Sequence, residues 1–187
     1  QYFSPPAQLA NDTTGYPSVL QRADGSAIAT PAEWEKRRDE LRNEWHRLLG
    51  PWPEVITEPE LEFLATERRG TITQHRVRFL WTPVEKTTGY LLIPQNKEQR
   101  SLPAVICVYY EPETGIGLRQ PQRDFAYQLA RRGFVTLSPD YPSLGEHEYD
   151  FDADKYASGS MKAIYDNMRA IDVLDHHRIA TAAGRAP

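Results

Sequence analysis

The fold of this chain is decided by residues 104–137, which include AVICVY at 104–109, PQRDFAYQLARR at 121–132 and GFVTL at 133–137. The first and last runs are apolar and rich in β-branched residues, which is typical of strands covered on both faces. The middle run places its apolar residues on one side of a helix, and a glycine closes it. Strand, helix and strand at this spacing predict a right-handed βαβ crossover with parallel strands.

Three stretches upstream of this unit alternate apolar with polar residues, as half-exposed strands do. They cover Leu61–Leu64, Ile72–Trp81 and Gly89–Ile93, and Arg68-Arg69-Gly70 is the expected turn between the first two. Downstream, residues from Tyr156 to Leu174 carry apolar side chains at helical spacing. The order of antiparallel strands, a βαβ unit and one more helix predicts an α/β fold with a mixed sheet.

The N-terminal part has a different character. Residues 1–29 are rich in Pro, Gly, Asn, Asp and Ser and show no period, which indicates an extended arm. Thr30-Pro31-Ala32-Glu33 has the composition of a helix start, and Gly50-Pro51 has that of a helix end. Between them lies an amphipathic helix, whose apolar stripe consists of Trp34, Leu41, Trp45 and Leu48.

Two regions are therefore expected. Residues 1–58 form an N-terminal arm and helix, and residues 59–187 form the main domain. An exposed stripe with two tryptophans would be an unusual patch on a monomer. We therefore expect the helix to pack through this stripe on the sheet or on its helices.

The composition of the chain excludes several classes of partner and one kind of cross-link. The chain has 187 residues, 40% of them apolar and 26% charged, as in soluble globular proteins. Its net charge is −4, from 22 basic and 26 acidic residues, so we expect no nucleic-acid partner. The longest apolar run, near 104–110, falls well below the roughly 20 residues of a membrane helix, so no membrane partner is expected. A single cysteine, Cys107, excludes an intrachain disulfide. A chain beginning at Gln1 is consistent with a secreted or periplasmic protein or with a trimmed one.

Five segments carry a resemblance to a known family. The segments are 103–108 (PAVICV), 133–142 (GFVTLSPDYP), 149–151 (YDF), 158–162 (SGSMK) and 168–174 (MRAIDVL). Together they resemble bacterial α/β-hydrolases of the dienelactone hydrolase and acetyl-xylan-esterase-like groups, and the likeness extends over about residues 71–174. The resemblance implies a three-layer α/β-hydrolase fold and serine esterase chemistry. It requires a Ser nucleophile on a strand-to-helix elbow, a His base and an acid that orients the His.

The chain departs from this family where the chemistry should lie. In the family the Gly-x-Ser-x-Gly elbow follows the strand after the helix at Met161–Leu174, and the acid and the His come later. Arg178-Ile179-Ala180 matches the start of that strand, but Thr181–Pro187 contains no serine. The expected fold is therefore a truncated hydrolase. No catalytic residue is assigned, and we expect the chain to be inactive on its own.

Some remnants of the site remain as candidates. The resemblance implies that the loop after the 104–109 strand supplies oxyanion-hole donors, which makes Tyr110 and Glu111 the candidate remnant. A carboxylate at Glu111 is unfavourable beside a developing oxyanion, and Pro112 has no N–H to donate. The further candidates for a cleft are Tyr109, Tyr141 and Ser143. Ser143 is followed by a glycine two residues later but lacks the first glycine of an elbow, so an ordinary turn serine is favoured.

Metal and cofactor sites are not expected. The alternating acidic residues at 148–154 resemble a calcium loop, but Lys155 and Met161 occupy the positions that need Gly and Glu. No phosphate-binding glycine motif is present. The adjacent pair His176–His177 follows an aspartate, but histidines near the end of a helix are a common structural choice.

Three hypotheses about function remain open. The chain is the N-terminal portion of an esterase-type hydrolase, or an enzyme whose missing half another chain supplies, or a non-enzymatic binding module on a hydrolase-derived scaffold. A small ester is a substrate only if the missing half is supplied. Without a following strand, Val105–Tyr109 becomes a sheet edge that neither Lys nor Pro protects. We therefore expect a homodimer through this edge, or a tail from Arg178 that folds back over it.

Overall fold

The chain divides into two compact units, Gln1–Leu48 and Leu49–Pro187. We expected a boundary after residue 58, later in the chain than this division. That boundary stays a prediction. The computed structural model describes residues 7–9, 15–82, 85–95, 102–140, 156–177 and 179.

The first unit holds a short 3-10 helix, η1 (Ala7–Leu9), and the long helix α1 (Pro31–Leu49). The predicted helix start is confirmed as a capping box. The Glu33 backbone N–H donates to Thr30 Oγ1 at 3.3 Å, and the Thr30 backbone N–H donates to Glu33 Oε2 at 3.1 Å. Beyond the helix, Gly50 has a φ of 94°, a conformation that L side chains rarely adopt.

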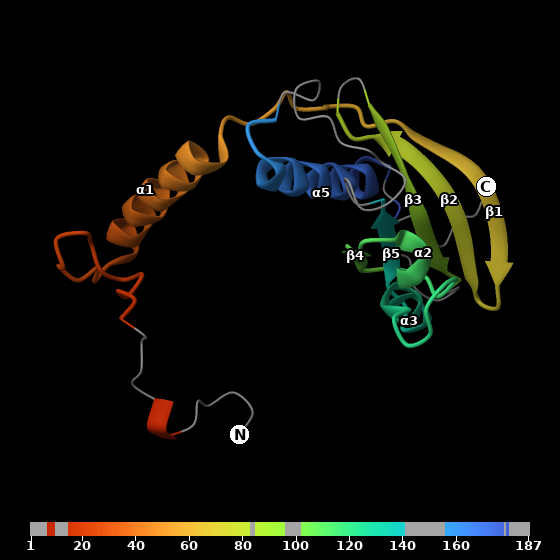
Figure 1. Ribbon diagram of the computed structural model, residues 1–187, viewed down its shortest axis with the longest axis horizontal. Helices are drawn as coiled ribbons and strands as arrows, with labels where there is room; N and C mark the ends of the chain where they lie inside the picture. Colours follow the sequence, from red (N-terminus) through yellow and green to blue (C-terminus); the bar gives the residue numbers. More distant parts are fainter. Residues whose placement is uncertain are drawn as a thin grey trace. The chain divides into compact units, whose positions relative to one another are not determined.

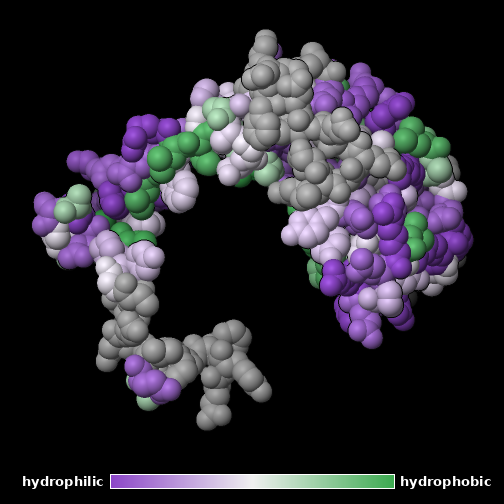
Figure 2. All heavy atoms as spheres, viewed as in Figure 1, coloured by the Kyte–Doolittle hydropathy of each residue, from purple (hydrophilic) through white to green (hydrophobic). Residues whose placement is uncertain are grey.

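The apolar stripe of α1 is exposed within the first unit. The helix has no buried residue, and the side chains of Trp45 and Leu48 are 61% and 67% exposed. Figure 2 shows hydrophobic atoms along the surface of this helix. Within the first unit nothing that the structure describes covers these side chains, and packing of the stripe on the sheet or on its helices stays a prediction. The amphipathic pattern correctly predicted a helix, but it did not determine what covers the helix.

The second unit is built on one mixed sheet of five strands in the order β1-β2-β3-β5-β4 (Figure 1). β1, β2, β3 and β5 pair antiparallel, each with the next in this order, and β4 pairs parallel with β5. This confirms an α/β fold with a mixed sheet. The strands are β1 (Leu61–Arg69), β2 (Ile72–Leu80), β3 (Lys86–Pro94), β4 (Ala104–Ile106) and β5 (Val135–Pro139).

The strand bounds differ from the prediction at two places. β1 continues to Arg69 because its polar second half pairs with β2 up to a turn at Gly70, which has a φ of 64°. β4 ends at Ile106 instead of Tyr109, although the apolar run continues. It pairs with β5 alone among the described strands, so it lies at the edge as predicted, but it is shorter and less buried than a central strand.

The helices of the second unit pack on opposite faces of the sheet. They are α2 (Pro112–Gly115), α3 (Phe125–Arg131) and α5 (Gly159–His176). α3 begins later than the predicted start near 121, and the single turn α2 was not predicted. α5 begins after its N-cap Ser158, whose Oγ accepts a hydrogen bond from the Met161 N–H at 3.1 Å.

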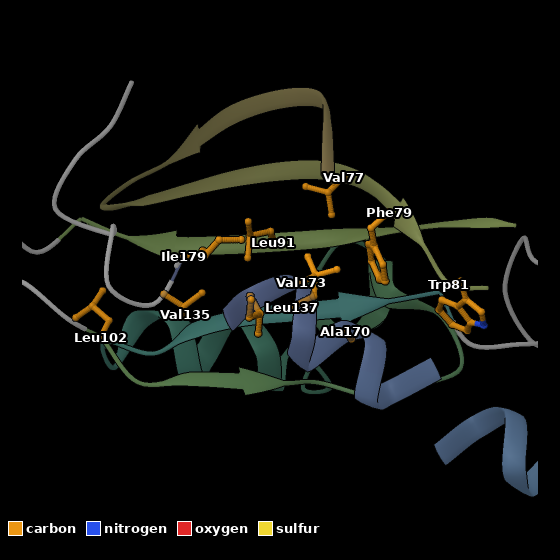
Figure 3. Packing of buried hydrophobic residues seen from close by; sticks show 11 residues of the cluster. Val77, Phe79, Trp81, Leu91, Leu102, Val135, Leu137, Ala170, Val173 and Ile179 are labelled. Carbon is orange, nitrogen blue, oxygen red and sulfur yellow. The ribbon is translucent and has the colours of Figure 1, made fainter. Parts of the chain in front are cut away.

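Alternate residues of each strand belong to separate cores, as a pleated sheet requires. Leu91 and Leu137 pack with Ala170 and Val173 of α5 (Figure 3). Leu92 and Cys107 pack on the other face with Ala126 and Ala130 of α3. Ile179 also packs in the first core, so the chain returns to the sheet after α5. In the described part of the chain no helix is long and apolar enough to cross a membrane.

Candidate functional site

The candidate site lies where β4 and β5 end. The two strands run parallel with Ile106 opposite Leu137, and the Cys107 N–H continues the pairing by donating to the Leu137 carbonyl at 2.8 Å. Because the carboxyl ends of parallel strands lie at the same edge, Cys107 and Asp140, which follow β4 and β5, lie at one edge of the sheet. Such an edge is the usual position of a site in an α/β sheet.

The loop after β4 contains the predicted oxyanion-hole residues. Tyr110 has a side chain that is 60% exposed, and Glu111 is the N-cap of α2 in an extended conformation. The Glu111 carbonyl accepts a hydrogen bond from the Thr114 N–H at 3.1 Å. No acceptor for the Tyr110 or Glu111 backbone N–H is found in the part of the chain that the structure describes. Both groups are therefore available as donors at this edge.

The carboxylate of Glu111 has partners of its own. The Thr114 hydroxyl donates to Glu111 Oε2 at 3.1 Å, and Arg119 Nη1 lies 3.3 Å from Glu111 Oε1. The pair with Arg119 is a surface pair that solvent screens. These contacts still offset part of the negative charge of the Glu111 carboxylate, which we expected to be unfavourable beside a developing oxyanion.

Tyr109 lies on the same loop and is held from two sides. Arg123 Nη1 donates to the Tyr109 hydroxyl at 2.7 Å, and the Phe125 ring meets the Tyr109 ring edge to face at 5.8 Å between centroids. Of the other two residues predicted for a cleft, Tyr141 and Ser143 both lie outside the described residues.

A polar network that the sequence did not predict links this edge to the neighbouring strands. Arg76 on β2 donates through Nη1 to the Tyr90 hydroxyl at 2.7 Å and to Glu113 Oε1 at 3.2 Å. Its Nη2 donates to Thr88 Oγ1 at 3.2 Å, and this hydroxyl donates to Asp140 Oδ2 at 3.1 Å. The network thus connects the first turn of α2 with the first residue after β5. The only hint in the sequence is Asp140, which belongs to a segment of the family resemblance.

Cys107 is buried under the same loop. Burial raises the pKa of its thiol to about 11, so the neutral thiol prevails near pH 7. A neutral thiol is a poor nucleophile. Cys107 therefore behaves as a small core residue.

His75 and His177 each lie beside an oxygen of a neighbouring residue, and His176 lies beside the His177 ring. His75 Nδ1 lies 2.8 Å from Thr66 Oγ1 on the paired strand, and burial lowers the pKa of His75. His176 and His177 are ring neighbours at 5.0 Å, and His177 Nε2 lies 2.8 Å from the Pro59 carbonyl oxygen. This supports the structural interpretation of the His176–His177 pair.

A separate cavity of about 310 Å³ lies between the segment before β1 and α5. Arg169 takes part in its lining, donates to the Ile56 carbonyl at 3.0 Å and pairs with Asp172. The remaining lining residues are Val55, Thr57, Pro59, Asp175 and His176. Neither Ser nor Cys is among the residues that line it. Within the described residues no group of three His, Cys, Asp or Glu side chains is placed to hold a metal ion.

Comparison with known proteins bears on the fold alone. No protein-family model and no curated protein matches the chain. A Bacteroides fragilis structure described as an acetyl xylan esterase matches with a TM-score of 0.61 and 19% identity, over 85% of this chain and 46% of that one. A promiscuous CE15 esterase from a marine bacterial metagenome matches with a TM-score of 0.54 and 12% identity, over 88% of this chain and 53% of that one.

The chain therefore spans about half the length of these structures. At such low identity the likeness carries neither substrate nor residue roles. It does agree with the mixed sheet and with the helices on its two faces. The chain has a hydrolase-like α/β fold that is similar to one part of these esterases.

Proposed function

We propose that this chain is the N-terminal portion of an esterase-type α/β-hydrolase and that it does not hydrolyse esters by itself. The observation that carries the proposal is the loop after β4. Its Tyr110 and Glu111 N–H groups stand available at the carboxyl edge of two parallel strands. Two backbone donors in this position suit the oxyanion of a tetrahedral intermediate in acyl transfer. The likeness to esterase structures supports the same class of reaction.

The reaction needs more than these donors. Hydrolysis of a carboxylic ester requires a nucleophile that attacks the carbonyl carbon and a base that accepts the nucleophile's proton. The sequence has no Gly-x-Ser-x-Gly. In the proposal, this chain contributes the oxyanion donors and half of the sheet, and the nucleophile, acid and base come from residues outside this sequence.

The inactivity is tested on the chain alone. Turnover of p-nitrophenyl acetate should not exceed that of an inert protein of similar size, and a fluorophosphonate probe should leave every serine, Ser143 included, unlabelled. Stoichiometric labelling of any serine would overturn this part of the proposal.

The assignment of the chain to an esterase-type hydrolase is tested by an experiment in which ester hydrolysis should appear. We would supply the second half as a separate polypeptide, taken from the sequence that follows codon 187 in the gene or from an esterase of similar structure. Ester hydrolysis should appear only in the mixture, and Tyr110→Pro, which removes one N–H, should reduce its kcat by about 100-fold. Tyr110→Phe keeps the N–H and serves as the control. If Tyr110→Pro and Tyr110→Phe hydrolyse the ester equally fast, the loop is not an oxyanion hole.

A second candidate function is that of an interaction module, and the position of β4 at the edge of the described strands favours it. The outer side of α5, which packs beside β4, exposes Ile164, Met168 and Ile171 in a row. We propose a second copy paired at β4 as the occupant, because a two-fold axis normal to the sheet would place β4 antiparallel against β4. Unpaired strand edges and apolar rows both favour such contacts.

Light scattering at micromolar concentration tests the homodimer. The proposal expects twice the chain mass, and Ile106→Pro in β4 should return the protein to a monomer. Leu64→Glu, on the opposite edge strand β1, should leave the dimer intact. A soluble monomer of the unsubstituted chain would rule the dimer out.

A further inference from the structure

The segment that leads into β1 is held beside α5 by its backbone carbonyls (Figure 1). Arg169 Nη1 donates to the Ile56 carbonyl oxygen at 3.0 Å, and His177 Nε2 lies 2.8 Å from the Pro59 carbonyl oxygen. The cavity of about 310 Å³ lies where these contacts hold the segment on the helix. Its walls are therefore fixed in the folded chain, and a preformed cavity binds a ligand with little loss of conformational entropy.

Carboxylates outnumber cationic side chains in the lining of this cavity. Arg169 is the one Lys or Arg among the described lining residues, and it pairs with Asp172. The Asp175 carboxylate lines the cavity too, and no partner for it is found among the described residues. The His176 ring completes this side and contacts the His177 ring.

Asp175 occupies an unfavourable position for an acidic residue. It lies in the last turn of α5, where the helix carbonyls carry a partial negative charge. A carboxylate at this end of a helix is destabilising unless a cation lies near it. The cavity beside Asp175 has room for such a cation.

We propose that this cavity binds a small primary alkylamine in its ammonium form, with the Asp175 carboxylate as the acceptor. A charge-assisted hydrogen bond from the ammonium group to the carboxylate would hold the charged end. Val55, Ile56 and Pro59 line the same cavity and offer an apolar wall to a short aliphatic chain. The volume is at the small end of ligand pockets, which suits a chain of a few carbons. This site uses none of the residues of the loop after β4, so it does not depend on the proposed function.

Other classes of ligand fit the cavity less well. An anion would need Arg169, but both of its Nη atoms have acceptors and its Nε is buried. A metal ion needs several ligands, and no group of three His, Cys, Asp or Glu side chains is placed for one within the described residues. A quaternary ammonium group binds over aromatic rings, and no Trp, Tyr or Phe is among the residues that line the cavity.

Binding is measured by NMR on the whole chain, with n-butylammonium chloride as the probe. The amide signals of residues 55–58 and 169–176 should shift, with a dissociation constant of about 1 mM for a ligand of this size. Butyrate and butan-1-ol have nearly the same size and chain, so they test the sign of the charge and the need for one. Ammonium chloride lacks the chain and should bind at least about fivefold more weakly because it makes no apolar contact.

Two variants test the role of Asp175. Asp175→Asn keeps the size of the side chain and removes its charge, so it should weaken n-butylammonium binding about fivefold, as the loss of a partly exposed ion pair does. Asp39→Asn alters an exposed carboxylate on α1 of the other unit, and this matched control should change binding by less than about twofold.

Every result decides for or against the proposal. Saturable shifts around the cavity with n-butylammonium, weaker with butyrate, with butan-1-ol and in Asp175→Asn, support it. No saturable shift by about 20 mM n-butylammonium, or binding of butyrate or butan-1-ol that is equally tight, would overturn it. Equal binding by Asp175→Asn, an equal loss in Asp39→Asn, or saturation at other residues would overturn it as well. Ester hydrolysis plays no part in these measurements, so failure of the proposed function leaves their result unchanged.

Discussion

Both faces of α5 depart from the usual polarity, although Met161, Tyr165, Ala170, Val173 and Leu174 are buried on its inner side. On the buried side, the Lys162 and Asp166 side chains are each 1% exposed, and Arg169 is buried beside them. On the outer side, Ile164, Met168 and Ile171 are 40–54% exposed. In a helix that covers a sheet, the aliphatic residues normally face the sheet and the charges face water.

The buried charges are stable because they have partners. Lys162 Nζ lies 3.1 Å from Asp166 Oδ2, and the Tyr156 hydroxyl donates to Asp166 Oδ1 at 3.1 Å. Lys162 also faces the Tyr156 and Trp81 rings at 4.8 and 5.4 Å from their centroids. The comparison teaches that the inner face of α5 combines apolar packing with a partnered pair of buried charges, whereas the aliphatic side chains of its outer face are exposed.

Breaking the buried Lys162–Asp166 pair should have the largest effect on the free energy of unfolding. Lys162→Ala leaves Asp166 buried without its cation, and we expect a loss of about 3–5 kcal/mol in the free energy of unfolding at pH 7.5. Chemical denaturation measures it. The exposed Lys36→Ala is the control and should change stability by less than about 0.5 kcal/mol. The double variant Lys162→Met with Asp166→Leu should recover most of the loss. A loss below 1 kcal/mol for Lys162→Ala would show that the pair does not hold this face.

The same pair should make stability depend on pH. Burial raises the pKa of Asp166 from 3.8 to about 7, although the Lys162 charge and hydrogen bonds from Lys162, Tyr156 and Trp81 lower it. The folded state therefore holds this proton more tightly than the unfolded state. The stability from Asp166 is complete below pH 4 and is lost as the pH rises through 7, by up to about 4 kcal/mol.

Urea denaturation at intervals between pH 4 and pH 8 tests this dependence. Asp166→Asn should remove the decline, and the difference between the two proteins isolates Asp166. That difference is needed because His75, whose pKa is lowered, contributes a change of opposite sign. Parallel curves for the two proteins would contradict the prediction.

Substitutions on the outer face of α5 should lower the free energy of unfolding much less than substitutions in the buried Lys162–Asp166 pair. Met168→Gln and Ile171→Gln replace exposed side chains, so each should change the unfolding free energy of the monomer by less than about 1 kcal/mol. Thermal unfolding at low concentration measures this. A concentration-dependent Tm in the unsubstituted chain that these variants abolish would instead show that a partner covers the row.

The smallest effect is expected at Trp45 of α1. Its exposed indole should contribute less than about 1 kcal/mol, so Trp45→Ala should leave the denaturation midpoint nearly unchanged. The buried Trp81→Ala in the other unit is the comparison and should cost about 3–5 kcal/mol. A loss of that size at Trp45 would show that this helix is buried after all.

The fold was predicted from local patterns to a large extent. The capping box at Thr30 and Glu33, the alternation in β2 and the apolar runs of β4 and β5 each predicted an element correctly. The predicted bounds of the elements are wrong where tertiary contacts override the local pattern. β4 stops at Ile106 although apolar residues continue, because the chain leaves the sheet there.

The candidate site was predicted less completely. The loop with Tyr109, Tyr110 and Glu111 was found through the family resemblance, but the Arg76 network was not. Arg76 and Glu113 are far apart in the sequence and belong to different elements. A hydrogen bond between such residues depends on strand register and on where α2 begins, and neither can be determined from spacing along the chain.

The sequence by itself determined the elements, their order and the mixed character of the sheet, because hydrophobic period, caps and glycines act over a few residues. Only the tertiary structure decided which side of α5 faces the sheet. Of the apolar residues at helical spacing, Met161 and Tyr165 are buried, whereas Ile164, Met168 and Ile171 are exposed. Lys162 and Asp166 are buried beside the apolar residues because a buried charge is stable only when a partner lies within reach, as Tyr156 and Trp81 do here.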